Sequence, residues 1–359
     1  MADRVFLHIG APKTGTTYVQ DRLSRNARAL AKHGVHFPTR SPLVSPGLFH
    51  FRAALDVLDQ DWGGPTGHAK GAWSALARKT RRLSGTVVIS HEILAPAPAE
   101  VIDRIVDDLG DAEVHVIYTA RDLARSLPAG WQESVKQGRR WRFRQFLERA
   151  QRADKLWFAK AVDIPAVLGA WSARVPADRI HLITVPSGPD SPLWSRFCEV
   201  VGIDQSWAPL ESDRANASLG SVETAVIRKL NKRMPREVRR QAEYDVLVRE
   251  LLAQKELVGR KSKPIRIPPE AYDWVEERTR QWLEWIDDSG IDVVGSTEEL
   301  RVTRPDPDEP WHNPDRIKAR RQLVAALDAL AAMTHEAAAR PDPKKGPLSK
   351  LRKRSLDQD

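Results

Sequence analysis

The sequence predicts an α/β fold in which a parallel sheet carries helices on both faces and is followed by a helical C-terminal extension. Short apolar runs alternate with amphipathic helical patterns through about the first 200 residues. This alternation is typical of parallel strands joined by right-handed helical crossovers. A glycine-containing turn joins the first apolar run to the first helix, and the second half of the chain has mostly helical patterns.

The predicted strands are short and almost wholly apolar, as strands buried on both faces are. The first ends near His8, and the others span residues 35–37, 86–90, 114–119 and 179–185. Early helices end at Gly34 and Gly110, since glycine commonly terminates helices. Later helices are predicted at residues 141–153, 192–201, 221–233, 236–258 and 269–288.

The chain divides into a main domain and a short C-terminal part. Residues 1–300 are predicted to form the main domain, within which residues 42–83 show no clean period and are interpreted as an insertion that shapes a substrate site. Residues 301–340 comprise a strap rich in proline and acid and a final Ala/Leu helix from about residue 315. The basic tail, residues 341–359, is predicted to be disordered.

Charge and cysteine content exclude several classes of protein. The single cysteine, Cys198, cannot form an intrachain disulfide. The net charge is +9, but six of the positive charges lie in the acid-free stretch 344–354, so the excess does not indicate a nucleic-acid partner. The simplest interpretation of this tail is a solvated end, and the alternative is weak attraction to an anionic membrane surface.

Targeting signals are not apparent in the sequence. Asp3 and Arg4 lead directly into the first strand, and no apolar run approaches the roughly 20 residues that a membrane helix requires. We therefore expect a cytoplasmic protein. The sequence leaves its oligomeric state open.

The turn after the first strand has the composition of a phosphate-binding loop. Residues 10–17, Gly-Ala-Pro-Lys-Thr-Gly-Thr-Thr, combine two glycines, one lysine and three threonines at the start of a helix. Backbone N–H groups and the helix dipole favour an anion there, while hydroxyls and an ammonium add contacts. Gly10 and Gly15 bracket four residues as in the Walker pattern, but Thr16 occupies the place of the nucleotide-kinase lysine.

The run Pro12-Lys13-Thr14-Gly15-Thr16-Thr17 resembles the 5′-phosphosulfate loop of the sulfotransferases that use 3′-phosphoadenosine 5′-phosphosulfate (PAPS). This resemblance implies a fold related to the P-loop nucleotide kinases. It also implies that these six residues bind PAPS and its product, adenosine 3′,5′-bisphosphate, and that the enzyme needs no metal. No carboxylate pair or His/Cys cluster stands at ligand spacing in the sequence.

A second match lies at the end of the strand 114–119. Arg121 occupies the position at which sulfotransferases bind the 3′-phosphate of PAPS, and the resemblance implies that role here. The family's serine, eight residues later, is replaced by Ala129, so Ser126 is the candidate for its hydroxyl. The alternative is that Arg121 and Asp122 merely start a helix, with Asp122 as its cap. The family's C-terminal glycine-rich loop has no clear match, and the basic run 260–263 is either its substitute or a solvated loop.

His91 and Glu92 are the candidates for the general base, because they follow the strand 86–90 at the carboxyl edge of the sheet. Relatives place a catalytic histidine or a glutamate after the corresponding strand. We prefer His91, since an imidazole already titrates near neutrality whereas a carboxylate needs a raised pKa. The alternatives are a packed or capping His91 and an exposed Glu92. His8 and His50 are weaker candidates for the base.

The predicted activity is sulfuryl transfer from PAPS to a hydroxyl, or an amine, of a small-molecule, carbohydrate or lipid acceptor. Such a transfer needs an in-line acceptor, stabilisation of charge on the transferred group and a base for the acceptor proton. A P-loop kinase of a small molecule would share the loop but should carry a lysine at position 16. A catalytically silent nucleotide-binding protein is the third interpretation.

Overall fold

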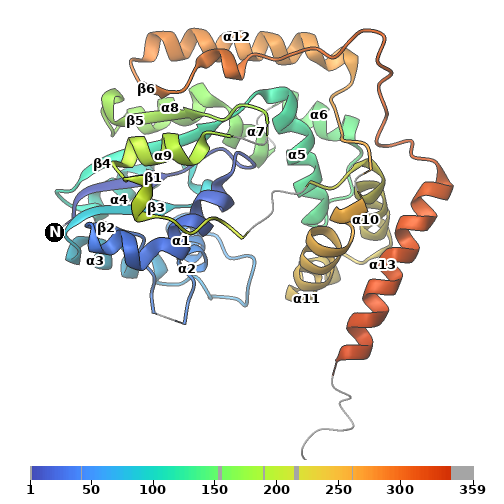
Figure 1. Cartoon of the computed structure of the whole chain (residues 1–359), viewed down its shortest axis with the longest axis horizontal. Helices are drawn as coiled ribbons and strands as arrows, with labels where there is room; N and C mark the ends of the chain where they lie inside the picture. The colour runs from blue at the N-terminus through green and yellow to red at the C-terminus, as the bar shows by residue number, and fades with distance from the viewer. Residues whose placement is uncertain are drawn as a thin grey trace, which may run out of the picture. The chain divides into compact units, whose positions relative to one another are not determined.

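The computed structural model describes residues 2–41, 43–152, 156–188, 191–213, 218–260 and 262–340. Its centre is a six-stranded sheet in the order β2-β3-β1-β4-β5-β6, and every neighbouring pair is parallel. The strands are β1 (Ala2–His8), β2 (Val35–His36), β3 (Gly85–Ser90), β4 (Glu113–Ala120), β5 (Ile180–Thr184) and β6 (Asp292–Val294). The predicted parallel α/β sheet is confirmed (Figure 1).

The strand register brings three candidate segments to one edge of the sheet. His8, the last residue of β1, pairs with Ser90 of β3 on one side and with Ile117 of β4 on the other. In the sheet, β3 and β2 lie on one side of β1, and β4, β5 and β6 lie on the other side. The direction in which successive strands are added therefore reverses beside β1. Ligands of open α/β sheets bind at such a switch point, at the carboxyl ends of the strands.

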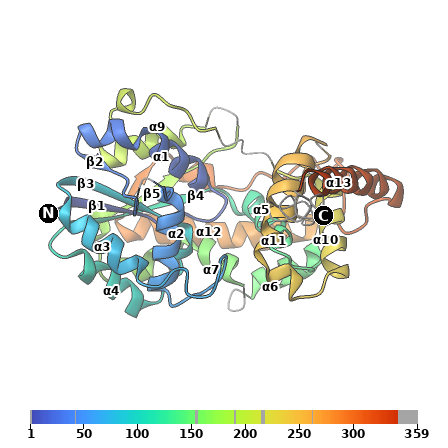
Figure 2. The same cartoon turned by 90° about the horizontal axis from the view of Figure 1, so that it is seen from below.

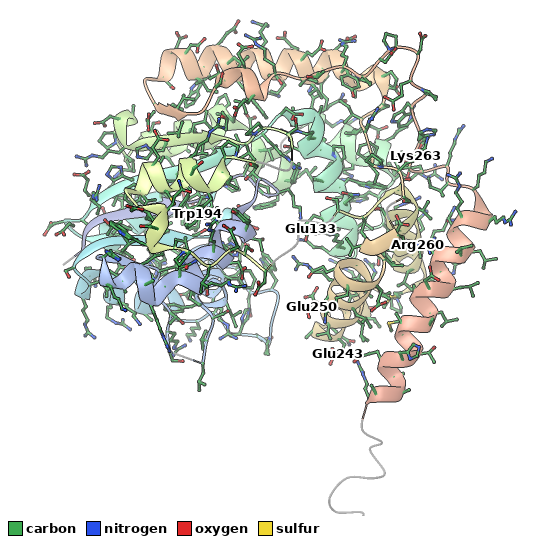
Figure 3. All side chains as sticks on the ribbon, viewed as in Figure 1. Glu133, Trp194, Glu243, Glu250, Arg260 and Lys263 are labelled. Carbon is green, nitrogen blue, oxygen red and sulfur yellow. The ribbon has the colours of Figure 1, made fainter. Side chains whose placement is uncertain are left out.

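Helices cover both faces of the sheet, as predicted (Figure 2). On one face, α1 (Thr16–Lys32) and α9 (Leu193–Val201) bury the apolar residues Phe6, Val88, Ile117 and Ile183. The other face is covered by α3 (Ala72–Arg82), α4 (Ala99–Leu109) and α8 (Ile164–Ser172). Trp194 of α9 (Figure 3) lies 4.6 Å from the guanidinium of Arg22 of α1, which joins the two helices through a cation–π contact.

The segment 42–83 contains two helices, which were not predicted. They are α2 (Pro46–Val57) and α3, joined by a loop that contains Gly63 and Gly64. Ser45 caps α2 by accepting a hydrogen bond from the N–H of Leu48, and Pro46 follows at the first helical position. The buried residues of α3 recur at helical spacing (Ala72, Trp73, Leu76, Ala77 and Thr80), so a signal for this helix was present in the sequence and was missed. The predicted substrate-shaping role of this segment stays a prediction.

The remaining helical segments agree only partly with the predicted ones. α10 (Ser221–Arg233) has the predicted bounds, whereas the predicted helix 236–258 is divided between a 3-10 turn, a short α-helix and a π-helix. The other elements are η1 (Glu92–Leu94), α5 (Leu123–Lys136), α6 (Phe143–Gln151), α7 (Trp157–Val162), η2 (Ala177–Arg179), η3 (Gln205–Trp207), η4 (Val238–Arg240), α11 (Ala242–Tyr244), η5 (Asp245–Glu256), η6 (Val258–Arg260), η7 (Pro269–Ala271), α12 (Tyr272–Ser289), η8 (Thr297–Leu300) and α13 (Ala319–Ala339).

The chain forms two compact units. The first comprises residues 1–131, 142–216 and 266–312 and contains the whole sheet, and the second comprises residues 132–141, 217–265 and 313–359. These units cut the chain elsewhere than at residue 300, and the predicted division stays a prediction. Within the second unit, the guanidinium of Arg260 (Figure 3) contacts the carboxylate of Glu223 at 3.3 Å. The predicted basic tail, 341–359, lies outside the described residues.

Candidate functional site

The 10–17 loop is anchored on β4 through its backbone. The N–H of Ile9 donates to the carbonyl oxygen of Ile117 at 2.9 Å, and the N–H of Ala11 donates to that of Thr119 at 2.9 Å. The hydroxyl of Thr14 turns inward, where it donates to the carbonyl oxygen of Ala11 at 2.6 Å. Thr14 therefore closes the loop on itself, and any contact it makes with a cofactor must come from its backbone.

Left-handed backbone positions shape the tip of this loop. Lys13 has φ 70° and Gly15 has φ 101°. Lys13 and Asp59 are the two residues other than glycine with positive φ in the part of the chain that the structure describes, and the lysine side chain is exposed. Such residues turn successive N–H groups toward a common side, the geometry of an anion-binding nest. Strain of this kind is concentrated at functional sites.

Position 15 is also closely packed against α9, in addition to its positive φ. A Cβ atom there would lie 2.4 Å from Cδ2 of Leu193, the first residue of α9. Gly15 also stands directly before α1, whose first turn carries no acidic residue and whose second position, Thr17, is exposed. No acidic side chain of this first turn offsets the positive end of the helix dipole, which fits a phosphate or sulfate group.

Polar atoms line the inner side of the loop next to Gly10. A Cβ atom on Gly10 would lie 2.8 Å from Oγ1 of Thr119, 2.9 Å from Oγ1 of Thr16 and 3.1 Å from Nε2 of His8. Both Nε2 of His8 and Oγ1 of Thr16 are buried, and neither has a hydrogen-bond partner among the described residues. Both atoms can therefore still form a hydrogen bond with a bound molecule.

His91 follows β3, and its N–H donates to the carbonyl oxygen of His8 at 3.1 Å. Its Nδ1 accepts a hydrogen bond from the N–H of Ile93 at 3.3 Å, so His91 caps η1. Burial lowers the pKa of His91, and the adjacent Glu92 carboxylate partly opposes that shift. The ring lies 5.1 Å from that of Phe51 of α2.

This capping contact bears on proton transfer. While Nδ1 accepts from Ile93, a neutral His91 carries its proton on Nε2, which cannot then accept another. His91 can act as a base through Nε2 only if the proton moves to Nδ1 and the contact with Ile93 is lost. The carboxylate of Glu92 needs no such change. His91 must therefore change its tautomer and lose its contact with Ile93 before it accepts a proton at Nε2, whereas Glu92 accepts a proton without such a change.

Arg121 follows β4 and is held by the first turn of α5. Its Nε donates to Oγ of Ser126 at 3.4 Å and its Nη2 to the carbonyl oxygen of Arg125 at 3.0 Å. Asp122 caps the helix by accepting from the N–H of Arg125 at 2.9 Å. Burial, followed by repulsion from Arg125, lowers the pKa of Arg121 to about 10, so its guanidinium is cationic at neutral pH.

Ser126 supports Arg121 in this structure. Its hydroxyl donates to the carbonyl oxygen of Asp122 at 3.0 Å while it accepts from Arg121, and the side chain is buried. Arg121 stands two residues after Thr119, which anchors the 10–17 loop. The sheet therefore brings the 10–17 loop and the candidate residues that follow β3 and β4 to one edge. Ser126 contacts the guanidinium of Arg121 and holds it in position.

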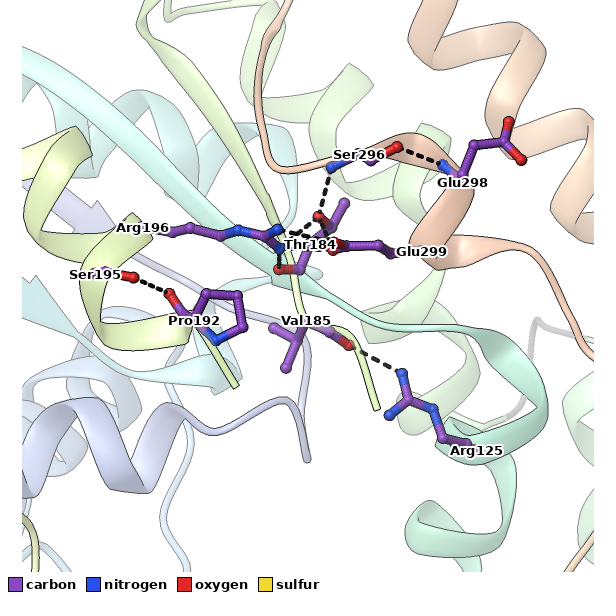
Figure 4. Close-up of polar contacts among 9 residues, drawn as sticks. All are labelled: Arg125, Thr184, Val185, Pro192, Ser195, Arg196, Ser296, Glu298 and Glu299. Atoms are coloured by element: carbon purple, nitrogen blue, oxygen red, sulfur yellow. Dashed lines mark hydrogen bonds and ion pairs between the residues drawn. The ribbon is translucent and has the colours of Figure 1, made fainter. Parts of the chain in front are cut away.

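Two groups of residues at this edge were not predicted. Ser90 ends β3 and Thr119 lies one residue before the end of β4, and a buried polar residue at such a place was an available signal; His8, which ends β1, was named only as a weaker candidate for the base. The second group is the Arg196–Glu299 network, in which the guanidinium of Arg196 makes paired contacts of 2.6 and 2.8 Å with the Glu299 carboxylate (Figure 4). These two residues are 103 positions apart, and no sequence pattern pairs them.

Comparisons with known proteins do not add to this geometry, because no protein-family model, no curated protein and no solved structure matches the chain. Within the described residues, no helix is both long and apolar enough to cross a bilayer. The same residues contain no cluster of three or more His, Cys, Asp or Glu side chains placed to hold a metal ion.

Proposed function

We propose that the protein is a PAPS-dependent sulfotransferase that acts on a hydroxyl, or an amine, of a small-molecule, carbohydrate or lipid acceptor. The observation that carries this proposal is the 10–17 loop, where a left-handed Lys13 and Gly15 precede a helix without acid in its first turn. The loop's resemblance to the 5′-phosphosulfate loop of sulfotransferases gives that anion site its chemical identity.

PAPS, when bound, supplies the sulfuryl group and a phosphate leaving group. In this proposal Lys13, the loop N–H groups and Thr17 stabilise the charge that develops on the transferred group and on the leaving phosphate. Their placement before the transfer step is what makes such donors effective. Arg121, held by Ser126 and the Arg125 carbonyl, contacts the 3′-phosphate. Thr14 and Thr16, whose hydroxyls are buried, act through their backbone and through the shape of the loop.

The base that removes the acceptor proton is His91 or Glu92. Both follow β3, whose last residue pairs with the last residue of β1, so both stand at the same edge of the sheet as the loop. The acceptor atom must approach in line with the bond that breaks, within hydrogen-bond reach of the base. The aromatic ring of Phe51 beside His91 offers an apolar wall for this approach.

A small-molecule kinase is the second candidate. It shares an anion-binding loop at the same switch point of the sheet, but the side chain in the kinase-lysine position is the buried hydroxyl of Thr16. A silent nucleotide-binding protein would keep the loop and Arg121 without a working base.

Parallel incubations separate the three candidates. The purified protein is mixed with a cell extract and either ³⁵S-labelled PAPS or ³²P-labelled ATP with Mg²⁺. A sulfotransferase produces a labelled product with PAPS alone, with a gain of about 80 Da, the mass of SO₃. Transfer from ATP supports the kinase. Retention of nucleotide without transfer supports the silent binder.

A further inference from the structure

One side of α13 is an exposed apolar face. The helix packs against α10 and η5 of the second unit, and it buries Gln322, Ala325 and Ala329 (Figure 1). Four large apolar side chains on its other side are 47–61% exposed: Leu323, Val324, Leu327 and Leu330. Residues three and four positions apart are neighbours on a helix, so these four form one patch. Single exposed apolar residues are ordinary, whereas a continuous patch indicates an interaction.

The second unit also carries the positive charge of the chain. Its segments, 132–141, 217–265 and 313–359, contain 26 Lys and Arg residues and 13 Asp and Glu residues. The first unit contains 31 basic and 35 acidic residues, so it has no positive excess. An excess of this kind in one unit attracts negatively charged partners.

Positive charges lie at both ends of the apolar face. Arg320 and Arg321 are exposed at the start of α13, and the acid-free stretch 344–354 with its six positive charges follows the end of the helix. The two acidic residues of α13 each contact a guanidinium group of the same unit: Asp328 that of Arg260, and Glu336 that of Arg340. The helix therefore combines an apolar face with flanking positive charge.

This combination fits an anionic lipid bilayer better than the two other possible occupants. A duplex nucleic acid offers phosphates to the basic residues but no apolar surface to the leucines. A second copy of the chain would bring two basic units together. A coiled coil also needs an apolar seam over three or four heptads, whereas Leu323, Leu327 and Leu330 span about one. Headgroups and acyl chains together satisfy both kinds of residue.

We propose that the second unit binds an anionic membrane surface, with α13 in the plane of the interface and Leu323, Leu327 and Leu330 at the boundary between headgroups and acyl chains. Because the other side of α13 is packed within its unit, the helix presents this one face to lipid. The arginines at its start and the stretch 344–354 contact lipid phosphates, as long basic side chains do at such boundaries. This binding needs neither PAPS nor turnover, so it does not rest on the proposed function.

The charge dependence is tested by sedimentation of the full-length protein with vesicles. We expect binding to phosphatidylcholine vesicles that contain about 30% phosphatidylserine, little binding to phosphatidylcholine alone, and a loss of binding as salt is added. Arg320→Gln/Arg321→Gln should lower the affinity about twentyfold, since each basic residue near an anionic surface contributes about fivefold. No binding to the anionic vesicles, or equal binding to both kinds, would overturn the proposal.

The contribution of the apolar face is tested by Leu323→Gln/Leu327→Gln, which leaves every charge in place. We expect its affinity for the anionic vesicles to fall about tenfold or more. Both leucines are exposed, so the variant should fold, and thermal unfolding checks this. The matched control is Leu48→Gln/Leu210→Gln, which changes two exposed leucines of the first unit and should bind as wild type does. An unchanged affinity in the α13 variant would overturn the insertion of the helix.

A fluorescent label reports whether α13 enters the bilayer. Cys198 is the single cysteine of the chain and is buried, so Leu330→Cys introduces an accessible thiol that a nitrobenzoxadiazole reagent can label. With anionic vesicles, emission from this label should increase and shift to shorter wavelength. A label on Lys32→Cys, at an exposed position of α1, should not change. Unchanged emission from the label on Leu330→Cys would contradict the proposal.

Two further measurements distinguish the other occupants. Dimer formation that Leu323→Gln/Leu327→Gln abolishes, without vesicle binding, would assign the apolar face to a second copy of the chain. Tight binding of duplex DNA that this variant leaves unchanged, again without vesicle binding, would assign the positive charge to a nucleic acid. Either result overturns the membrane proposal, whereas vesicle binding that both the arginine and the leucine variants weaken supports it.

Discussion

The 10–17 loop and the Arg196–Glu299 network lie at the same edge of the sheet, but their polar groups are used differently. In the network (Figure 4), Arg196 contacts both carboxylate oxygens of Glu299 and the backbone carbonyl of Thr184. The hydroxyl of Thr184 donates to Glu299 at 2.6 Å and accepts from the N–H of Ser296 at 3.2 Å. These groups satisfy one another and join β5, α9 and η8.

In the loop and at the end of β1, by contrast, Oγ1 of Thr16 and Nε2 of His8 are buried without a partner among the described residues, and Lys13 adopts a left-handed conformation. A saturated network of charges stabilises a fold and leaves little capacity for a ligand. Unsaturated groups and backbone strain are stabilised by what binds to them. The comparison therefore predicts that changes in the loop and its neighbours affect ligands and turnover, whereas changes in the network affect stability.

The largest effect is expected from removal of the general base. His91→Ala or Glu92→Gln, whichever removes it, should lower the turnover number by about 10²–10⁴ with binding of PAPS intact. Because burial lowers the pKa of His91, a histidine base would remain unprotonated below its ordinary pKa, and activity would persist into mildly acidic solution. Steady-state kinetics across pH test this expectation. Near-normal turnover in both variants would place the base elsewhere, with the segment 42–83 as the region to search.

A second large effect is expected from Lys13→Ala, which should abolish detectable turnover and weaken the binding of adenosine 3′,5′-bisphosphate. One ammonium contact with a desolvated phosphate contributes about 2–4 kcal/mol. Calorimetry and single-turnover assays measure the two effects. The exposed Lys32, at the last turn of α1, provides a control variant of the same kind. A folded Lys13→Ala protein with unchanged affinity and turnover would contradict the assignment of the 10–17 loop as the anion site.

Arg121→Ala is expected to lose the preference for PAPS over adenosine 5′-phosphosulfate, because the 3′-phosphate would lose its guanidinium contact. The change in the ratio of kcat/KM values should be about 10–100-fold, as for a hydrogen bond to a charged group. Ser126→Ala should show the same change at a smaller size, since Ser126 holds Arg121 at 3.4 Å. A KM for PAPS that is unaltered in Arg121→Ala would contradict this role.

The smallest functional effect is expected from Glu299→Gln. This variant removes the negative charge that pairs with Arg196, while the glutamine side chain has nearly the same shape as glutamate. We expect a loss of about 1–3 kcal/mol in the free energy of unfolding, with unchanged affinity for adenosine 3′,5′-bisphosphate. Denaturant unfolding and calorimetry measure the two quantities. A marked loss of affinity for the bisphosphate at unchanged stability would contradict our assignment of the Arg196–Glu299 network to stability alone.

The pH dependence of this stability has a definite sign. Hydrogen bonds from Arg196 hold the pKa of Glu299 below its ordinary value. The pair therefore contributes its full stability above the pKa of an unfolded glutamate, about 4.3, and loses that contribution as the pH falls through the lower folded-state pKa. The difference in stability between wild type and Glu299→Gln should shrink in that acidic range. A difference that grows on acidification would contradict the assignment.

The sequence predicted the fold well where one physical rule was sufficient. The strands β3, β4 and β5 are short apolar runs, and α10 follows a clear helical period. β6 was missed because it has three residues and begins with Asp292, so only its pairing with β5 identifies it. The region 245–256 was predicted as part of an ordinary helix, because the periods of α- and π-helices cannot be separated over so few turns.

For the candidate site, the sequence identified which residues gather at the edge but not how their polar atoms are used. The inward turn of Thr14 depends on Thr119, which is 105 positions away, and the support of Arg121 by Ser126 depends on the backbone geometry of the first turn of α5. A capping His91 was one of the alternatives that the sequence left open, and the structure shows that contact. The hydrogen bond between Nδ1 of His8 and the hydroxyl of Ser90 could not be anticipated, since the two residues are 82 positions apart. Sequence patterns predict which residues gather at the edge of the sheet. The hydrogen bonds of their polar atoms depend on contacts that form only in the folded protein.

The most direct test of the central claim is calorimetric titration of the full-length protein with adenosine 3′,5′-bisphosphate in the absence of Mg²⁺, and separately with ATP and Mg²⁺. If the 10–17 loop and Arg121 form a PAPS site, the bisphosphate binds without metal, and more tightly than ATP. Tighter binding of ATP with Mg²⁺, or no binding of either ligand, would contradict the account.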